Sequence, residues 1–123
     1  MTGILELRHG VRVLMCAPDG PTIRNDRDAV DVIASAMEQD STFVVIPVAR
    51  LDEDFFVLRT GVAGDIVQKF VNYRVRLAVV GDTSRWLDSS SFRDYVTETN
   101  RGGQTWVVPD LDELDRRLRA VVR

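Results

Sequence analysis

The chain has 123 residues, of which 16 are basic and 19 are acidic, so its formal net charge is −3. Hydrophobic residues make up 45% of the chain, a typical globular proportion, and a chain of this length can bury a core without a disulfide or a metal ion. The sequence contains one cysteine, one histidine and one lysine, which excludes a disulfide framework, a Cys/His zinc site and paired-lysine Schiff-base chemistry.

The first third of the chain predicts a hairpin, a loop and a helix. Two β-prone runs, residues 4–7 and 11–16, flank a glycine-containing turn that holds His9. The prolines and the glycine at 17–21 cannot continue a strand or a helix, so this segment predicts a loop. Asn25 then offers a cap for a helix that ends near residue 40. Its expected apolar face consists of Ala29, Val30, Ile33, Ala36 and Met37.

The rest of the chain alternates strands and helices. The continuous apolar run at 42–48 predicts a strand that is buried on both faces, with Pro47 at its end. A short helical turn that opens with acids is expected within 51–58, and a helix from about 61 to 73. Further strands are expected at 76–80 and 105–108, and further helices at about 89–99 and from 109 onward.

This order of elements predicts an α/β fold. Strands that alternate with helices form mostly parallel sheets with right-handed crossovers, and the opening hairpin adds one antiparallel edge strand. We therefore expect residues 1–123 to form a single domain. It would contain a five-stranded, mostly parallel mixed sheet with an antiparallel N-terminal edge hairpin and about four helices.

Polar side chains gather in the loops that follow the predicted parallel strands. In open α/β sheets, ligands bind outside the carboxyl ends of the strands. The loops at that edge supply Asp19, Asp54, Arg59, Thr60 and Asp82. A small-molecule or enzymatic site built from Asp19, Arg59, Thr60 and Asp82 would need a pocket in which these groups converge, and a carboxylate with a shifted pKa.

Thr60 precedes Gly61 at the expected start of a helix. A threonine hydroxyl in that position can cap the helix by accepting a backbone N–H bond. The positive end of a helix also favours an anion, so a phosphoryl group on Thr60 would be stabilised there, and the neighbouring Arg59 could pair with it. Two interpretations stay open: Thr60 only caps the helix, or it is also a phosphoacceptor.

Phe55 and Phe56 are candidates for a binding surface. Adjacent side chains on a helical turn point about 100° apart, so one ring is expected to face the core and the other to be exposed. The alternative is that both rings are buried in this small domain.

Motifs of several enzyme classes are missing from the sequence. A phospho-accepting receiver domain needs a lysine after its last strand, whereas Lys69 lies within a predicted helix. There is no GxGxxG dinucleotide fingerprint and no Walker phosphate loop. A serine–histidine–aspartate triad would depend on His9 in the hairpin turn, and Cys16 ends a buried strand, where an inert thiol is expected. We expect no catalytic residue, no metal site and no cofactor; the sequence leaves enzymatic activity open and favours its absence.

Four strings resemble a bacterial family known as domain of unknown function forty-one-eighty. They are APDGP at 17–21, DEDFFVLRTGVAGDIVQKFVNYRVRLAVVGD at 52–82, NRG at 100–102 and VVPDLDEL at 107–114. The chain is also similar in its order of elements to STAS domains, the fold of bacterial anti-sigma-factor antagonists. The second helix of a STAS domain begins at a Ser/Thr-Gly pair whose hydroxyl a partner kinase phosphorylates, and Thr60-Gly61 falls at that place. This resemblance implies a STAS-like fold with a kinase-like regulator as partner.

These features favour a non-enzymatic regulatory or partner-binding module. Its binding surface would consist of residues 54–60 and the helix that follows, and its partner would be a protein that the sequence does not identify. The alternative is the small-molecule binder or enzyme at the carboxyl edge of the sheet. A third interpretation is a self-associating subunit, such as a homodimer.

Charge and hydropathy exclude two other classes of partner. A mildly acidic chain with scattered arginines lacks the basic stripe that displaces counterions from nucleic acid. No apolar run has the length of a membrane span, and the N-terminal residues lack a secretion signal. With a single cysteine, we expect a cytoplasmic protein that binds neither nucleic acid nor membrane.

Overall fold

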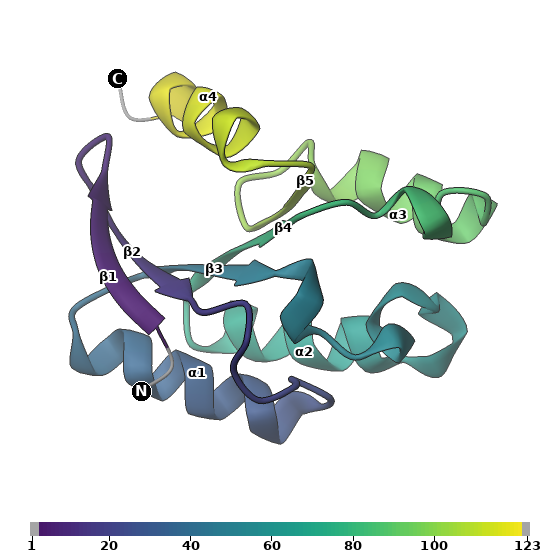
Figure 1. Cartoon of the computed structure of the whole chain (residues 1–123), viewed down its shortest axis with the longest axis horizontal. Coiled ribbons are helices and arrows are strands. Elements are labelled where there is room, and N and C mark those ends of the chain that lie inside the picture. Colours follow the sequence, from purple (N-terminus) through teal and green to yellow (C-terminus); the bar gives the residue numbers. More distant parts are fainter. Residues whose placement is uncertain (1–2, 122–123) are drawn as a thin grey trace.

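The computed structural model describes residues 3–121 and shows a five-stranded mixed sheet with helices on both faces (Figure 1). The strands are β1 (Gly3–Arg8), β2 (Val11–Cys16), β3 (Phe43–Pro47), β4 (Arg76–Val80) and β5 (Thr105–Val108). They lie in the sheet in chain order, with β1 and β2 antiparallel and the other neighbours parallel. The predicted fold class and the antiparallel edge hairpin are confirmed.

Within residues 3–121, four α-helices follow the strands, at the places that the sequence predicts. They are α1 (Asp26–Glu38), α2 (Val62–Asn72), α3 (Ser90–Thr99) and α4 (Leu111–Val121). The predicted cap of α1 is confirmed, because the Asn25 side chain accepts a hydrogen bond from the Asp28 backbone N–H at 3.0 Å. No helix in this described part of the chain has both the length and the apolar character needed to cross a bilayer.

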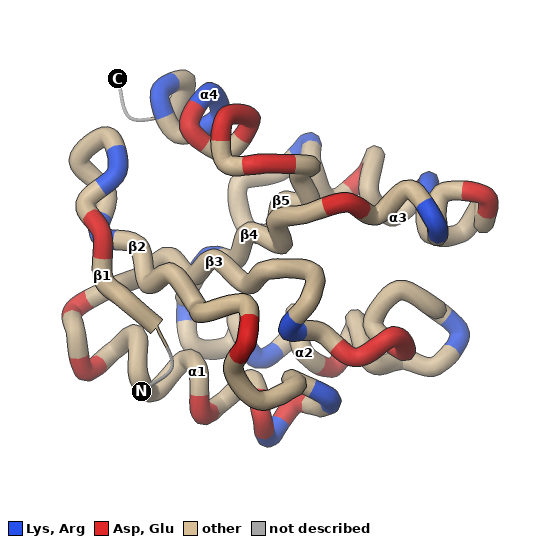
Figure 2. Tube along the Cα trace, in the orientation of Figure 1, with Lys and Arg blue, Asp and Glu red and all other residues tan. Residues whose placement is uncertain are grey.

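The hairpin between β1 and β2 closes with His9 and Gly10, whose φ angles are 50° and 83°. Positive φ at both central residues defines a type I′ turn, which matches the twist of the two strands. The hairpin also contacts α4, because the Arg8 guanidinium lies 2.8 Å from the Asp115 carboxylate and His9 lies 3.6 Å from it. Figure 2 shows charges of both signs on the hairpin and on α4. An ion pair therefore joins the first hairpin to the last helix.

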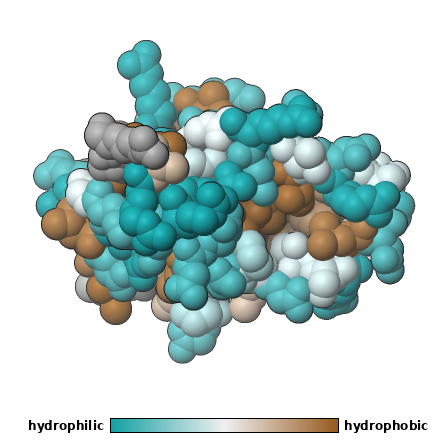
Figure 3. Space-filling view, turned by 90° about the horizontal axis from the view of Figure 1, so that it is seen from above, coloured by the Kyte–Doolittle hydropathy of each residue, from teal (hydrophilic) through white to brown (hydrophobic). Residues whose placement is uncertain are grey.

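The sheet carries a hydrophobic core on each face. On one face α1, α2 and α3 cover the strands, with the rings of Phe70 and Phe92 among the fully buried side chains. On the other face α4 packs through Leu114 and Leu118 against Phe43, Trp106 and their neighbours. Figure 3, seen from above Figure 1, shows a mostly hydrophilic surface with some hydrophobic groups exposed near its centre.

The buried face of α1 differs in part from the predicted one. The buried residues are Ala29, Val32, Ile33 and Ala36. They follow the helical spacing i, i+3, i+4, i+7, which is the narrow stripe that can face a sheet. Met37 lies just beyond this stripe near the end of the helix and is 53% exposed, so its prediction as a core residue is wrong.

Candidate functional site

Three short 3-10 helices lie between β3 and α2 and bring several predicted site residues to the surface. They are η1 (Val48–Arg50), η2 (Glu53–Phe56) and η3 (Leu58–Thr60). Asp52 caps η2 by accepting a hydrogen bond from the Asp54 backbone N–H at 3.0 Å. Asp54, Arg59 and Thr60 are exposed. The predicted helical turn is therefore real, and these three predicted site residues lie on its outer surface.

Thr60 holds this segment together but is not the cap residue of α2. Its hydroxyl lies 2.8 Å from the carbonyl oxygens of Asp54 and Val57, and it accepts the Val62 backbone N–H at 3.3 Å. The cap position is occupied by Gly61, whose φ of 79° is left-handed and favours glycine. Thr60 therefore lies one residue before the cap position, but its hydroxyl accepts the N–H of the first residue of α2, which is the predicted kind of bond.

Phe55 and Phe56 are both buried, with 0% and 2% of their surface exposed. Of the two interpretations left open by the sequence, burial of both rings is therefore confirmed, and exposure of one ring is wrong. The reason is that elements pack against both sides of η2: the Phe56 ring stacks on Trp86 of η4 (Ser84–Trp86) at 3.9 Å and meets Phe92 of α3 edge-on at 5.7 Å. These two rings support the surface and do not form it.

A hollow of about 300 Å³ lies between the η2–η3 segment and the start of α3. Two arginines from separate loops, Arg59 and Arg85, line it together with Trp86, Ser89 and Ser91. The Arg85 guanidinium lies 4.7 Å from the centre of the Trp86 ring and forms an ion pair with Glu53. The hollow thus combines two cations and two hydroxyl side chains.

The sequence-based prediction included Arg59 but missed Arg85, Trp86, Ser89 and Ser91. An available signal was the string SRW, which places an arginine and a tryptophan in the loop after β4, shortly before a run of serines. That signal does not reveal that Arg85 and Trp86 contact the segment of Phe56 and Arg59, because the contact between η2 and η4 depends on the tertiary fold.

Asp19 and Asp82 are exposed in other loops at the carboxyl edge. Asp82 lines a different hollow, of about 330 Å³, between the end of β4 and Pro109. The Ser84 backbone N–H donates to its carboxylate at 2.9 Å, and this bond together with the Ser84 hydroxyl lowers the pKa of Asp82. Because Arg59 and Asp82 line separate hollows, the structure does not gather the four residues of the small-molecule alternative into either of them.

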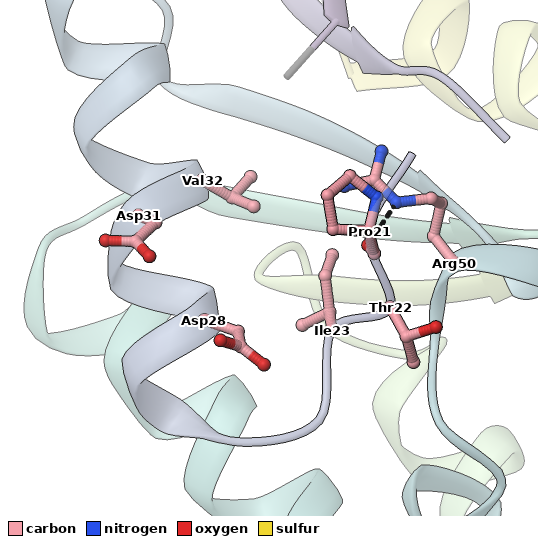
Figure 4. Close-up of a pocket in the computed structure, with 7 residues that line it drawn as sticks. All are labelled: Pro21, Thr22, Ile23, Asp28, Asp31, Val32 and Arg50. Carbon is pink, nitrogen blue, oxygen red and sulfur yellow. Dashed lines mark hydrogen bonds between the residues drawn. The ribbon is translucent and has the colours of Figure 1, made fainter. Parts of the chain in front are cut away.

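A buried arginine, which the sequence-based prediction also missed, holds the loop after β2 (Figure 4). Arg50 is 2% exposed, and its Nε and Nη1 atoms donate to the carbonyl oxygens of Pro21 and Ala17, each at 2.7 Å. Within residues 3–121 it forms no ion pair with a carboxylate. A Cβ on Gly20 would lie 2.5 Å from Nη1, so glycine is needed where the loop passes the guanidinium.

Beside Arg50, a hollow of about 280 Å³ separates α1 from the loop. Asp28 and Val32 extend from α1 toward the loop, with Ile23 opposite them, whereas the Asp31 carboxylate points away from the loop (Figure 4). Backbone bonds at 2.7 Å and 3.0 Å also join Ile23 to Arg50 and to Asp52. Since two N–H groups of Arg50 are already bonded to carbonyls of the loop, its evident role is to fix that loop.

An apolar groove of about 430 Å³ lies on the face of the sheet that carries α4. Ile4 and Met15 line it from the hairpin, Val45 and Val80 from the central strands, and Leu111 from the start of α4. It exists because α4 leaves the carboxyl ends of these strands partly uncovered.

Cys16 also borders this groove, but its thiol is only 4% exposed. Burial raises the pKa of Cys16 to about 11, and the nearby Arg50 charge opposes the rise. We therefore expect iodoacetamide at neutral pH to label Cys16 roughly a hundredfold more slowly in the folded protein than in concentrated urea, because the thiolate is scarce and shielded. Mass spectrometry of the labelled protein would measure both rates, and equal rates would show that the thiol is accessible.

Comparison with known proteins identifies a family. A family model described as Domain of unknown function (DUF4180) matches residues 8–118. Neither the curated proteins nor the solved structures include a significant match. The matched segment runs from the end of β1 into α4 and includes every residue of the hollow between η3 and α3. The chain therefore belongs to the DUF4180 family.

Proposed function

We propose that this protein is a regulatory module that binds an acidic group of a partner protein in the hollow lined by Arg59 and Arg85. The observation that supports the proposal is that both arginines line one hollow together with the hydroxyl-bearing residues Ser89 and Ser91. Guanidinium groups bind carboxylates and phosphates through paired N–H donors, and nearby hydroxyls can complete the hydrogen bonding.

The guanidinium groups of both arginines are available to bind a partner. Within residues 3–121, Arg59 donates no side-chain hydrogen bond and forms no ion pair. Arg85 pairs with Glu53, but both side chains are largely exposed: 67% of the Arg85 side chain and 63% of the Glu53 side chain. Exposed ion pairs contribute little stability, so a partner's acidic group could replace Glu53 at small cost. The stack of the buried Phe56 ring on the half-buried Trp86 ring keeps the floor of the hollow in place.

Thr60 would regulate this binding. Its side chain is exposed next to Arg59, at the start of α2. A phosphoryl group on Thr60 would add a dianion beside Arg59 and compete with the partner's acid for its guanidinium. The resemblance to STAS domains, in which a partner kinase phosphorylates a hydroxyl at this place, supports the same role for Thr60.

The test replaces Arg59 and Arg85 together with alanine. We expect the loss of two charged hydrogen-bonding groups to weaken capture of the partner at least tenfold, since each such bond contributes about 1.5–3 kcal/mol. The measurement is quantitative affinity purification with mass spectrometry, followed by titration of the captured protein. The matched control replaces Arg24 and Arg27, which are exposed at the start of α1, with alanine and so removes the same charge. If the control variant lost as much affinity for the partner as the Arg59 and Arg85 double variant, the proposal would be contradicted.

Thr60→Glu tests the regulatory part. The glutamate places a negative charge beside Arg59, so we expect capture of the same partner to fall further than in Thr60→Gln, which loses the same hydroxyl contacts but adds no charge. Thr60→Ser, which keeps the hydroxyl, should retain capture. Unchanged capture by Thr60→Glu would remove Thr60 from the proposal and leave the arginine hollow untouched.

A further inference from the structure

β1 is an edge strand that lacks the usual protection against pairing. Its six residues pair with β2 in an unbroken register from Gly3↔Cys16 to Arg8↔Val11. In the described part of the chain, no strand pairs with its other edge. Natural edge strands are commonly blocked by proline, by charged side chains or by a bulge. Between Gly3 and Arg8 there is no proline or bulge, and the two charged side chains, Glu6 and Arg8, pair with each other.

The type I′ turn determines which backbone groups of β1 are free. In a hairpin with a two-residue turn, the flanking residues Arg8 and Val11 form a hydrogen-bonded pair, and bonded and non-bonded pairs alternate from there. Ile4 and Glu6 therefore bond to β2. The N–H and C=O groups of Leu5 and Leu7 point away from the sheet, where another strand could bind them.

The side chains of this edge are apolar and its charges are balanced. Ile4 is 68% exposed and Leu7 is 73% exposed, and these two side chains lie on opposite faces of the strand. Glu6 and Arg8 form an ion pair at 2.9 Å, so β1 has no net charge to repel a second β1 strand. These properties allow β1 to pair with its own copy in the antiparallel direction.

We propose that two copies of this chain associate through β1, antiparallel around a two-fold axis normal to the sheet. This arrangement joins two five-stranded sheets into one continuous sheet. With Leu5 on the axis, the free groups of Leu5 pair with those of the other Leu5. Leu7 then lies opposite Gly3 of the second copy, which has no side chain. A register centred on Glu6 is excluded, because it would place two glutamates directly opposite each other.

Size-exclusion chromatography with light scattering tests the association. We expect wild-type protein to have twice the mass of the 13.9 kDa chain and Leu7→Lys to have the mass of one chain. Leu7 is exposed, so its replacement leaves the monomer folded. The matched control is Met37→Lys, an exposed apolar residue of α1 that should remain dimeric. A wild-type monomer at every attainable concentration, or a dimer that Leu7→Lys does not weaken, would overturn the proposal.

Amide hydrogen exchange tests the pairing itself. In the dimer, the amides of Leu5 and Leu7 should be protected, and dilution or Leu7→Lys should expose them. The amides of Ile4 and Glu6 should stay protected in both states, because they bond to β2. If the protection of the Leu5 amide did not change with protein concentration, pairing at this edge would be contradicted. The Arg59 and Arg85 double variant should remain dimeric, so the proposed function and the dimer can fail separately.

Discussion

Replacing Arg50 with methionine is expected to lower the free energy of unfolding by about 3–5 kcal/mol. Methionine can fill much of the space of the side chain but cannot donate hydrogen bonds. The carbonyl oxygens of Ala17 and Pro21 would each lose a charged donor at 2.7 Å. Because the guanidinium is 2% exposed, water has little access to replace it. The loop after β2 would then lose its main side-chain anchor.

Urea unfolding measures this effect, and three further variants separate its causes. Arg50→Lys keeps the charge but not the planar fork, so it should lie between wild type and Arg50→Met. Gly20→Ala should cost about 1–3 kcal/mol, since its Cβ would press on the guanidinium. Arg27→Met, at an exposed site on α1, should cost less than about 0.5 kcal/mol. If Arg50→Met cost no more than Arg27→Met, the anchoring role of Arg50 would be wrong.

Phe56→Ala is expected to lower the free energy of unfolding by about 3–5 kcal/mol, as is usual for a large buried aromatic side chain. Its ring touches three others, at centroid distances of 5.2 Å for Phe55, 3.9 Å for Trp86 and 5.7 Å for Phe92. The cavity would open directly beneath the arginine-lined hollow. The variant should therefore impair partner capture as well as stability.

A double-mutant cycle with Trp86→Ala isolates the stacking contact. We expect a coupling energy of about 0.5–1.5 kcal/mol between the two rings. Phe56→Leu should lose less stability than Phe56→Ala, because it leaves a smaller cavity. Tyr73→Ala is the control, since that ring is 47% exposed at the end of α2. Additive effects of Phe56→Ala and Trp86→Ala would show that the stack does not tie η2 to η4.

Local patterns were sufficient to predict the elements of this fold. The apolar run at 42–48 and the cap at Asn25 each act within a few residues, and β3 does end at Pro47. Met37 was misplaced because helical spacing reveals an apolar face but not where the neighbouring sheet stops. Strand order needed no long-range information, because each strand lies beside its neighbour in sequence.

The site was predicted less well because it depends on contacts between distant loops. Arg59 was identified from its position at the carboxyl edge, but its companion Arg85 belongs to another loop. The burial of Phe55 and Phe56 depends on packing from α2, η4 and α3, which no local pattern encodes. Arg50 looked like an ordinary surface arginine, since its two acceptors lie 29 and 33 residues away.

The ion pair between Arg8 and Asp115 joins residues that are 107 positions apart in the chain. During synthesis, each new strand can dock on the strand made just before it, so the sheet can grow in the order of translation. The hairpin tip, by contrast, must wait for α4 before Arg8 gains its second ionic partner, Asp115. Until then Arg8 can pair only with Glu6 of its own strand, so the contact with Asp115 forms after all five strands have been synthesised.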